Sequence, residues 1–193
     1  MKRTDEELIV DYQQGDETAL QLLYERYKRP ILNFSLRILN NRADAEDVTA
    51  QVFLTLVTKR HAYHPKAKFS TWLFRVAHNN CITCIRKRKK IMSLWHKDNE
   101  TSQYEQRDIP DSVDSPREKL EKSESAEYLK QAIEKLPLVQ KEALILREYH
   151  ALNYQQIALV LDCSLENVKI LIFRARVHLR KELSSSLKED KNG

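Results

Sequence analysis

Residues 153–181 contain two helical patterns separated by a short break at residues 162–164, and the second pattern carries cations at helical spacing. Apolar side chains before the break fall on one side of a helix, and Ser164 can cap a second helix starting at Leu165. One face of that second helix then carries Lys169, Phe173, Arg176 and Arg180. Cations placed in this way neutralise phosphates and reach base edges in the major groove. The pattern predicts a DNA-reading helix-turn-helix, with an amphipathic helix whose basic side only meets water as the alternative.

Three clustered carboxylates, Asp44, Glu46 and Asp47, open another expected helix, in which Asp44 is the predicted cap. Such a cluster could hold a metal, perform acid/base chemistry or complement the helix dipole, and dipole matching is the default. The chain has no His-x-x-x-His, glycine-rich phosphate loop or Gly-x-Ser-x-Gly string. We therefore predict no catalytic residues and no enzyme. An exposed acidic face could instead dock onto a basic protein surface.

Residues 63–90 interleave aromatic, cationic and amide side chains. Single-stranded nucleic acid is held by this combination, because aromatic faces stack on unpaired bases, amides bond base edges and cations follow the backbone. Trp72 shares a helical stripe with apolar neighbours, so it is predicted to be structural. Phe69, just before the predicted cap Ser70, is predicted to be partly exposed.

His78, Cys81 and Cys84 lie on one loose helical stripe, so a zinc or redox site could be drawn there. Zinc sites ordinarily take four ligands, and the remaining Cys163 lies in the other half of the chain. We predict buried, apolar cysteines, no metal and no cofactor. An odd total of three cysteines also argues against a disulfide scaffold and indicates a reducing compartment.

Composition favours a soluble, helical, mildly basic protein. The 193 residues carry a formal net charge of +5, and only two are glycines, which leaves few of the turns that hairpins use. No apolar run approaches the roughly 18 residues of a membrane span, and the amino terminus is too charged for a signal peptide. We predict an all-α fold, no membrane insertion and a cytoplasmic location.

The chain divides into two small helical domains joined by a flexible acidic linker. Helical patterns fill residues 5–92. Gly15 can end a first helix in a left-handed conformation, Asp16 can cap the next helix, and Pro30 sits where another helix could begin. Residues 93–125 are polar, rich in acids and without apolar periodicity, which also fits a tether that is acidic only for solubility. Residues 126–183 hold the helix-turn-helix, and residues 184–193 are predicted to be a disordered tail.

Several strings in this order resemble the bacterial sigma-70 family of RNA polymerase sigma factors, and more closely its extracytoplasmic-function (ECF) branch. They are residues 5–8, 14–16, 44–48 with Phe53, 69–73, and the segment from Leu136-Pro137 to Arg180. The resemblance covers about residues 5–92, the family's region 2, and 126–183, its region 4. It implies a non-enzymatic initiation subunit that brings core polymerase to promoters and helps to melt them.

The resemblance also implies roles for particular residues. Contact with the clamp helices of the polymerase's largest subunit would fall to Asp44, Glu46, Asp47, Gln51 and Phe53. The −10 element would be bound by His64, Lys66, Lys68, Phe69, Ser70, Thr71, Arg75, Asn79, Asn80, Arg86 and Arg88. The −35 element would be bound by Ser164, Glu166, Asn167, Lys169, Ile170, Phe173, Arg174, Arg176 and Arg180. Further implied partners are the polymerase flap and an anti-sigma factor.

The segment Ile170-Leu171-Ile172 departs from the family pattern, in which a short polar or basic residue follows the Val-Lys pair. Ile170 could instead contact a thymine methyl group. Two other classes of function stay open on the residues alone. One is an autonomous helix-turn-helix regulator that binds duplex operators as a dimer. The other is a metal-dependent nucleic-acid enzyme that uses Asp44, Glu46 and Asp47.

Overall fold

The computed structural model describes residues 3–61, 63–64, 67–95 and 127–189, and within these ranges it is helical and has no strand. Its labelled helices are α1 (Asp5–Gln13), α2 (Glu17–Leu39), α3 (Arg42–Thr58), α4 (Phe69–Trp95), α6 (Leu138–Glu148), α7 (Tyr154–Leu161) and α8 (Leu165–Glu189). A helical stretch at residues 127–134 precedes α6. The predicted all-α fold is confirmed. Lys66 and, from residue 96, the predicted linker lie outside the described residues.

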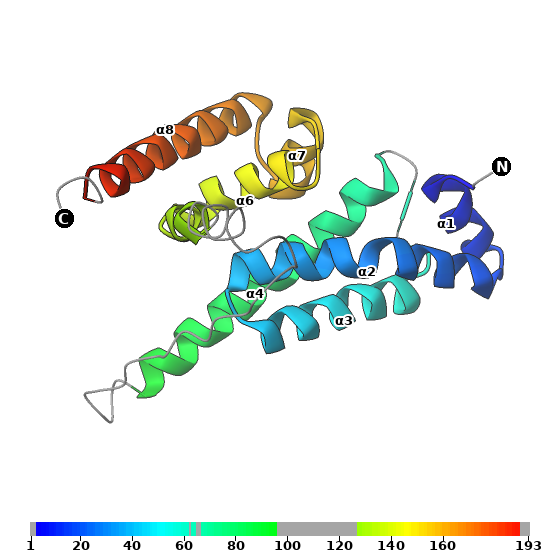
Figure 1. The fold of residues 1–193 in the computed structure, drawn as a ribbon. Helices are drawn as coiled ribbons and strands as arrows, with labels where there is room; N and C mark the ends of the chain where they lie inside the picture. Colours follow the sequence, from blue (N-terminus) through cyan, green and yellow to red (C-terminus); the bar gives the residue numbers. More distant parts are fainter. Residues whose placement is uncertain (1–2, 62, 65–66, 96–126, 190–193) are drawn as a thin grey trace, which may run out of the picture.

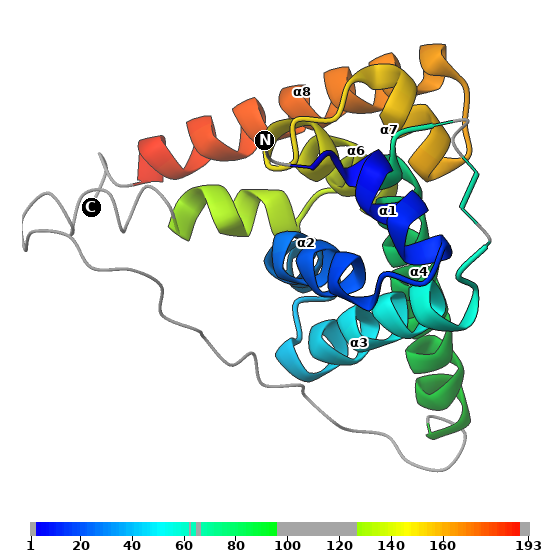
Figure 2. The ribbon, with the colours of Figure 1, turned by 90° about the vertical axis from the view of Figure 1, so that its right-hand side faces the viewer.

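The helices form two groups that pack against each other (Figures 1 and 2). In the first, α2 and α3 lie side by side, α1 covers one end of α2, and the long α4 crosses both α2 and α3. The second group holds α6, α7 and α8, and it meets the first where α6 contacts α2 and α7 contacts α4. The helix α8 lies on the side of the second group that faces away from α1, α2 and α3.

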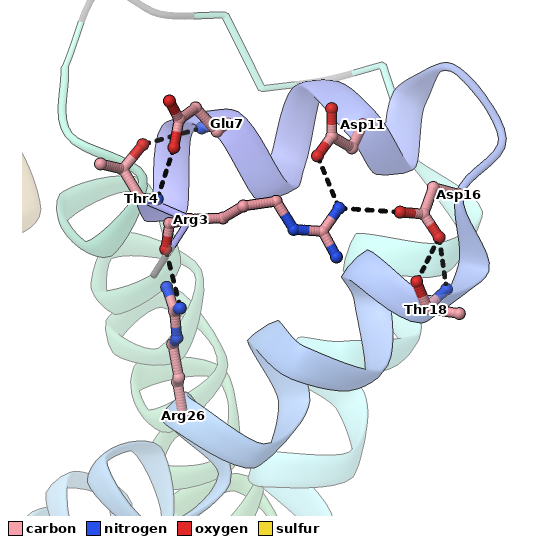
Figure 3. Close-up of polar contacts among 7 residues, drawn as sticks. All are labelled: Arg3, Thr4, Glu7, Asp11, Asp16, Thr18 and Arg26. Carbon is pink, nitrogen blue, oxygen red and sulfur yellow. Dashed lines mark hydrogen bonds and ion pairs between the residues drawn. The ribbon is translucent and has the colours of Figure 1, made fainter. Parts of the chain in front are cut away.

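The corner between α1 and α2 forms as the sequence predicts. Gly15 takes a φ of +112°, a left-handed conformation that other residues rarely adopt. Asp16 caps α2 by accepting the N–H of Thr18 at 2.9 Å. Hydrogen bonds from the Thr18 side chain and from Arg3 lower the pKa of Asp16 to about 2. Arg3 also pairs with Asp11 at 2.8 Å, so that one guanidinium ties α1 to the start of α2 (Figure 3).

Pro30 does not begin a helix, contrary to the sequence prediction, but lies inside α2. A proline removes one backbone hydrogen bond and crowds the preceding turn, which usually kinks or ends a helix. Here α2 packs against α1, α3, α4 and α6, and Ile31 and Phe34, just after the proline, are fully buried. Tertiary packing on several sides therefore carries the helix through the proline.

The cap of α3 is Asn41 and not Asp44, which corrects the sequence prediction. Asn41 has an extended backbone, and its side chain accepts the N–H of Asp44 at 2.9 Å. Asp44 instead lies in the first turn and turns its carboxylate toward α4, where Cys84 Sγ lies 3.2 Å away and Arg88 forms an ion pair with it. Asp44 thus helps to hold α3 against α4.

The first group is organised around the inward stripe of α4. Phe69, Leu73, Ala77 and Cys81 follow one another at a spacing of four residues and are all fully buried. The helix begins without the predicted Ser70 cap. Its first N–H, that of Phe69, is bound instead by the carboxylate of Glu6 on α1 at 3.1 Å.

The seam between the two groups is partly aromatic and partly ionic. The ring of His150, which follows α6, lies 4.5 Å from the ring of Phe74 and 5.9 Å from that of Phe34, measured between centroids. The guanidinium of Arg37 stacks over the Tyr149 ring at 4.1 Å. Apolar residues of both groups form one continuous buried cluster across this seam. The two predicted domains are therefore packed together in this conformation.

The helix α8 continues to Glu189, so the prediction of a disordered tail from residue 184 is corrected for residues 184–189. Neither Pro nor Gly interrupts the sequence there, and nothing local ends the helix. Residues 190–193 lie outside the described residues.

We predict that acid loosens the seam through His150. Burial, followed by the charge of Arg37, lowers the pKa of His150 from 6.5 to about 4. Because the unfolded chain binds this proton more readily, the contribution of neutral His150 is present above pH 6.5 and is lost as the pH falls toward 4. Urea unfolding from pH 7 to pH 4 should show wild type losing on the order of 2 kcal/mol more than His150→Gln. The exposed His61→Gln should follow wild type, and parallel pH profiles for all three proteins would contradict the prediction.

Candidate nucleic-acid interface

The helix-turn-helix forms where the sequence predicts it. The helix α7 ends at Asp162, whose left-handed φ of +54° turns the chain. Ser164 then accepts the N–H of Asn167 at 3.1 Å, and α8 starts at Leu165. Ile157 and Val160 of α7 are fully buried and support the second helix.

The two sides of α8 differ as a DNA-reading helix requires. An inward stripe of Val168, Ile172 and Ala175 is buried, and Leu179 packs against it. All nine residues predicted to bind the −35 element are exposed: Ser164, Glu166, Asn167, Lys169, Ile170, Phe173, Arg174, Arg176 and Arg180. Arg176 is paired with Glu148 of α6 at 2.8 Å, and the hydroxyl of Ser164 is engaged in capping. The remaining cations are presented together on one surface.

Part of the predicted −10 set forms one exposed stripe along α4. Arg75, Asn79 and Arg86 are exposed on the same side of the helix, and Lys68, seven residues before Arg75, is exposed just before the first residue of α4. His64 is exposed in the preceding loop. Cations and an amide thus line up over more than four helical turns.

The prediction that Phe69 is partly exposed is wrong, whereas Trp72 packs against the core as predicted. Phe69 is fully buried, with its ring in edge contact with those of Tyr27 and Tyr63. Trp72 stacks on Phe69 at 6.0 Å between centroids but stays only half-buried. Because Trp72 lies four residues after Lys68, it is the ring that borders the exposed stripe. The sequence did not indicate this exposed edge of Trp72, because the residue stands among apolar neighbours.

Other predicted −10 residues are held inside the first group. Thr71 is buried, and Asn80 donates to the carbonyl of Val76 at 3.1 Å. Arg88 is paired with Asp44 of α3. Ser70 is half-buried. The structure therefore places fewer of the predicted −10 residues on one exposed surface than the sequence suggested.

The residues of α3 that are predicted to contact the polymerase are partly exposed and partly buried. Asp47 and Gln51 are exposed on one face, and Glu46 is exposed and paired with Arg42 at 2.8 Å. Phe53 is buried in edge contact with the ring of Tyr24 at 4.8 Å. Sequence reasoning missed Leu54 and Val57, which are about half exposed on α3. Helical spacing could have predicted their exposure, because they fall outside the inward stripe of Val48, Val52 and Leu56.

The histidine and cysteines of α4 point to different partners. His78 Nδ1 lies 2.9 Å from the carboxylate of Glu142 on α6, and Cys84 lies against Asp44. Burial raises the pKa of the Cys81 thiol to about 12. Among residues 3–61, 63–64, 67–95 and 127–189, no three His, Cys, Asp or Glu side chains gather as metal ligands.

The described residues form no strand, and they combine a helix-turn-helix with a separate basic stripe on α4, as in the class of helical DNA-binding proteins. Residues 23–91 match the family model described as Sigma-70 region 2, and residues 126–179 match Sigma-70, region 4. The chain is 30% identical over 188 residues to the RNA polymerase sigma-H factor of Pseudomonas aeruginosa, covering 96% of each chain. It is 31% identical over 183 residues to the ECF RNA polymerase sigma-E factor of Haemophilus influenzae, covering 93% of this chain and 95% of that one.

The chain belongs to the sigma-70 family, in its ECF branch. It is a sigma factor, a non-enzymatic transcription initiation factor. An autonomous helix-turn-helix regulator or a metal-dependent nucleic-acid enzyme would leave the region 2 match unexplained.

Solved structures share the fold. The sigma factor RpoE in complex with the anti-sigma factor NepR from Bartonella quintana superposes with a TM-score of 0.69 at 20% identity, covering 85% of this chain and 96% of that one. CnrH, in complex with the cytosolic domain of CnrY, gives a TM-score of 0.64 at 20% identity over 92% and 96% of the two chains. In the part of this chain that the structure describes, no helix is long and apolar enough to cross a membrane.

The buried His78–Glu142 pair yields a stability prediction. The Glu142 side chain is 1% exposed, and its second carboxylate oxygen has no hydrogen-bond partner among the described residues. His78→Ala should therefore lower the free energy of unfolding by about 3 kcal/mol, because it leaves a buried carboxyl group without its partner. Adding Glu142→Leu should recover part of that loss in urea unfolding.

Arg75→Ala provides the control for this experiment. It breaks the Arg75–Asp162 pair, whose side chains are 47% and 84% exposed, and should lose less than about 1 kcal/mol. Equal losses in His78→Ala and in the His78→Ala, Glu142→Leu double variant would contradict the predicted role of the buried pair.

Proposed function

We propose that the chain binds core RNA polymerase through α3, contacts the −10 element through α4 and the −35 element through α8, and helps to open the promoter. The observation that carries this proposal is the separation of three exposed surfaces on three helices of one chain. An acidic and apolar face lies on α3, a basic and amide stripe on α4, and a basic face on the second helix of a helix-turn-helix.

The polymerase surface is the exposed side of α3. Asp47, Gln51 and Leu54 follow at a spacing of four and three residues, so that a charge, an amide and an apolar side chain share one face. Interfaces combine an apolar centre with a polar rim in this way. We assign the centre to Leu54 and Val57, and the rim to Glu46, Asp47 and Gln51. Asp44 and Phe53 support this face from within.

The −10 surface is the stripe of α4. Lys68, Arg75 and Arg86 supply positive charge along a path long enough to follow a strand, and Asn79 supplies a donor and an acceptor for a base edge. An unpaired base needs an aromatic face to replace its lost stacking. We assign that role to the half-buried Trp72 and give Phe69 the structural role of holding Trp72 from behind.

The −35 surface is the outward face of α8. Lys169, Arg174 and Arg180 are exposed cations suited to phosphate contacts, and the first turns of this helix are placed to enter a major groove. The helix α6, by contrast, is buried from Gln140 to Leu146, so that it offers little surface to the polymerase flap in this conformation.

Promoter binding requires the seam to loosen in this proposal. Arg75 belongs to the −10 stripe but pairs at 3.1 Å with Asp162, the turn residue of the helix-turn-helix. Such an exposed pair is worth little and breaks readily. Freeing Arg75 removes one contact between α4 and α7, and the second group can reach a distant element once the apolar seam opens as well.

We also propose that the chain acts in the cytoplasm and is held by an anti-sigma factor until needed. One solved structure of the same fold is a complex with an anti-sigma factor, and another is a complex with the cytosolic domain of a second protein, CnrY. The exposed apolar residues of α3 and α8 offer surfaces that a partner could cover.

The experiment that tests the function adds the purified chain to core polymerase and a library of promoter fragments, and then sequences the transcripts. New start sites that share two upstream elements are expected. An absence of new start sites, together with tight binding of duplex DNA by the chain alone, would overturn the proposal.

Charge reversal on α3 should weaken polymerase binding. In the double variant Glu46→Arg, Asp47→Arg, like charges would meet a basic surface on the polymerase, and the dissociation constant should rise by about tenfold or more. Both side chains are exposed, so that circular dichroism and thermal unfolding should stay close to wild type.

The matched control is Glu17→Arg, Glu25→Arg on α2. It changes the net charge by the same amount at two other exposed sites and should leave binding unchanged. Fluorescence anisotropy with core polymerase measures both constants. Equal binding by the α3 variant and wild type would remove α3 as the docking surface.

A further inference from the structure

We propose that Ile170 and Phe173 form an apolar pair on α8 that recognises thymine methyl groups on neighbouring base pairs. This inference rests on the proposed function, because it assigns a base preference to the helix already proposed to bind the −35 element. The observation behind it is that both of these large apolar side chains are exposed to solvent. Phe173 is 68% exposed, the highest value among the large apolar residues in the described part of the chain, and Ile170 is 47% exposed.

The two side chains are neighbours on the side of α8 opposite its core. Successive helical residues are rotated by about 100°, so positions three apart lie close together. Measured from the buried Val168, Ile170 falls about 200° around the helix and Phe173 about 140°. Neither side chain is needed to hold α8 in place, because Val168, Ile172 and Ala175 already pack its inner face.

Cations flank this pair on both sides. On the same scale, Lys169 and Arg180 fall about 100° and 120° around the helix, and Arg174 falls about 240°. All three are exposed. A central apolar strip with positive charge on each side matches a major groove, where a phosphate backbone runs along each wall. An apolar protein partner would leave these charges without counterparts, so the charge pattern favours duplex DNA as the occupant.

Only one apolar group on the base-pair edges of the major groove fits such a strip. Isoleucine and phenylalanine side chains neither donate nor accept hydrogen bonds, whereas the base edges present donors, acceptors and the C5 methyl group of thymine. Placing these side chains against guanine or adenine edges would remove water from polar atoms without replacing its hydrogen bonds. The chemistry of the pair therefore selects thymine.

The spacing of the pair sets the arrangement of the thymines. Three residues correspond to a rise of about 4.5 Å along the helix axis. Neighbouring base pairs are about 3.4 Å apart. Ile170 and Phe173 therefore reach adjacent base pairs, and we expect thymines at adjacent positions of the upstream element, on either strand.

The test removes only the methyl groups. The holoenzyme formed by the full chain and core polymerase first selects duplexes from a random upstream library. Each thymine of the selected −35 element is then replaced by deoxyuridine, which pairs identically but lacks the C5 methyl group. Dissociation constants are measured for both duplexes at one salt concentration, because affinity for DNA depends on salt.

Loss of one contacted methyl group should weaken binding about fourfold, and loss of two should weaken it by more than about tenfold. Holoenzymes with Ile170→Ala or Phe173→Ala should bind the thymine duplex more weakly and should lose this sensitivity to deoxyuridine. The control Val139→Ala removes a side chain of similar exposure on α6 and should keep the full methyl effect. All three positions are exposed, so thermal unfolding should confirm intact folds.

The outcomes separate this inference from the proposed function. If a duplex is selected but deoxyuridine leaves its affinity unchanged, the apolar pair serves another occupant and this inference fails alone. A methyl effect that persists in both Ile170→Ala and Phe173→Ala also overturns it. If no upstream element is selected at all, the proposed role of α8 fails as well.

Discussion

The inward stripe of α4 is the contact on which the remaining structure depends. Phe69, Leu73, Ala77 and Cys81 are fully buried, and each large side chain of this kind contributes about 1.5 to 3 kcal/mol through burial. The same helix contacts α1, α2, α3 and α7, so both groups of helices are positioned by it. Because this stripe fixes the rotation of α4, it also decides that Lys68, Arg75, Asn79 and Arg86 face outward together.

Periodicity and local capping rules were enough to predict the elements that rest on contacts close in sequence. The helix-turn-helix is such a case, since Ser164 caps its own helix and the buried side of α8 follows from spacing alone. The Gly15 and Asp16 corner is another. Both rest on interactions within a few residues, and these are visible in one sequence.

Several wrong or missing predictions depend on contacts between distant residues. Phe69 is buried because Tyr27 and Tyr63 close over it, and its N–H is bound by Glu6, so no local cap was required. Pro30 stays helical because neighbouring helices hold α2 on several sides. The sequence also gave no sign that His78 would meet Glu142, which lies 64 residues away.

The seam between the two groups combines burial with poorly satisfied polar atoms. Its apolar part includes the rings of Phe34 and Phe74. It also encloses two polar atoms, one carboxylate oxygen of Glu142 and Nε2 of His150, that have no hydrogen-bond partner among the described residues. Buried polar atoms without hydrogen bonds each cost about 1 to 3 kcal/mol. Opening the seam would let water bind the Glu142 oxygen and His150 Nε2, and this gain in free energy would offset part of the loss of apolar contact. Glu142 and His150 therefore lower the stability of the closed packing. The first group carries a cost of the same kind at Thr71 Oγ1, which is buried and has no partner among the described residues, so this cost is not confined to the seam.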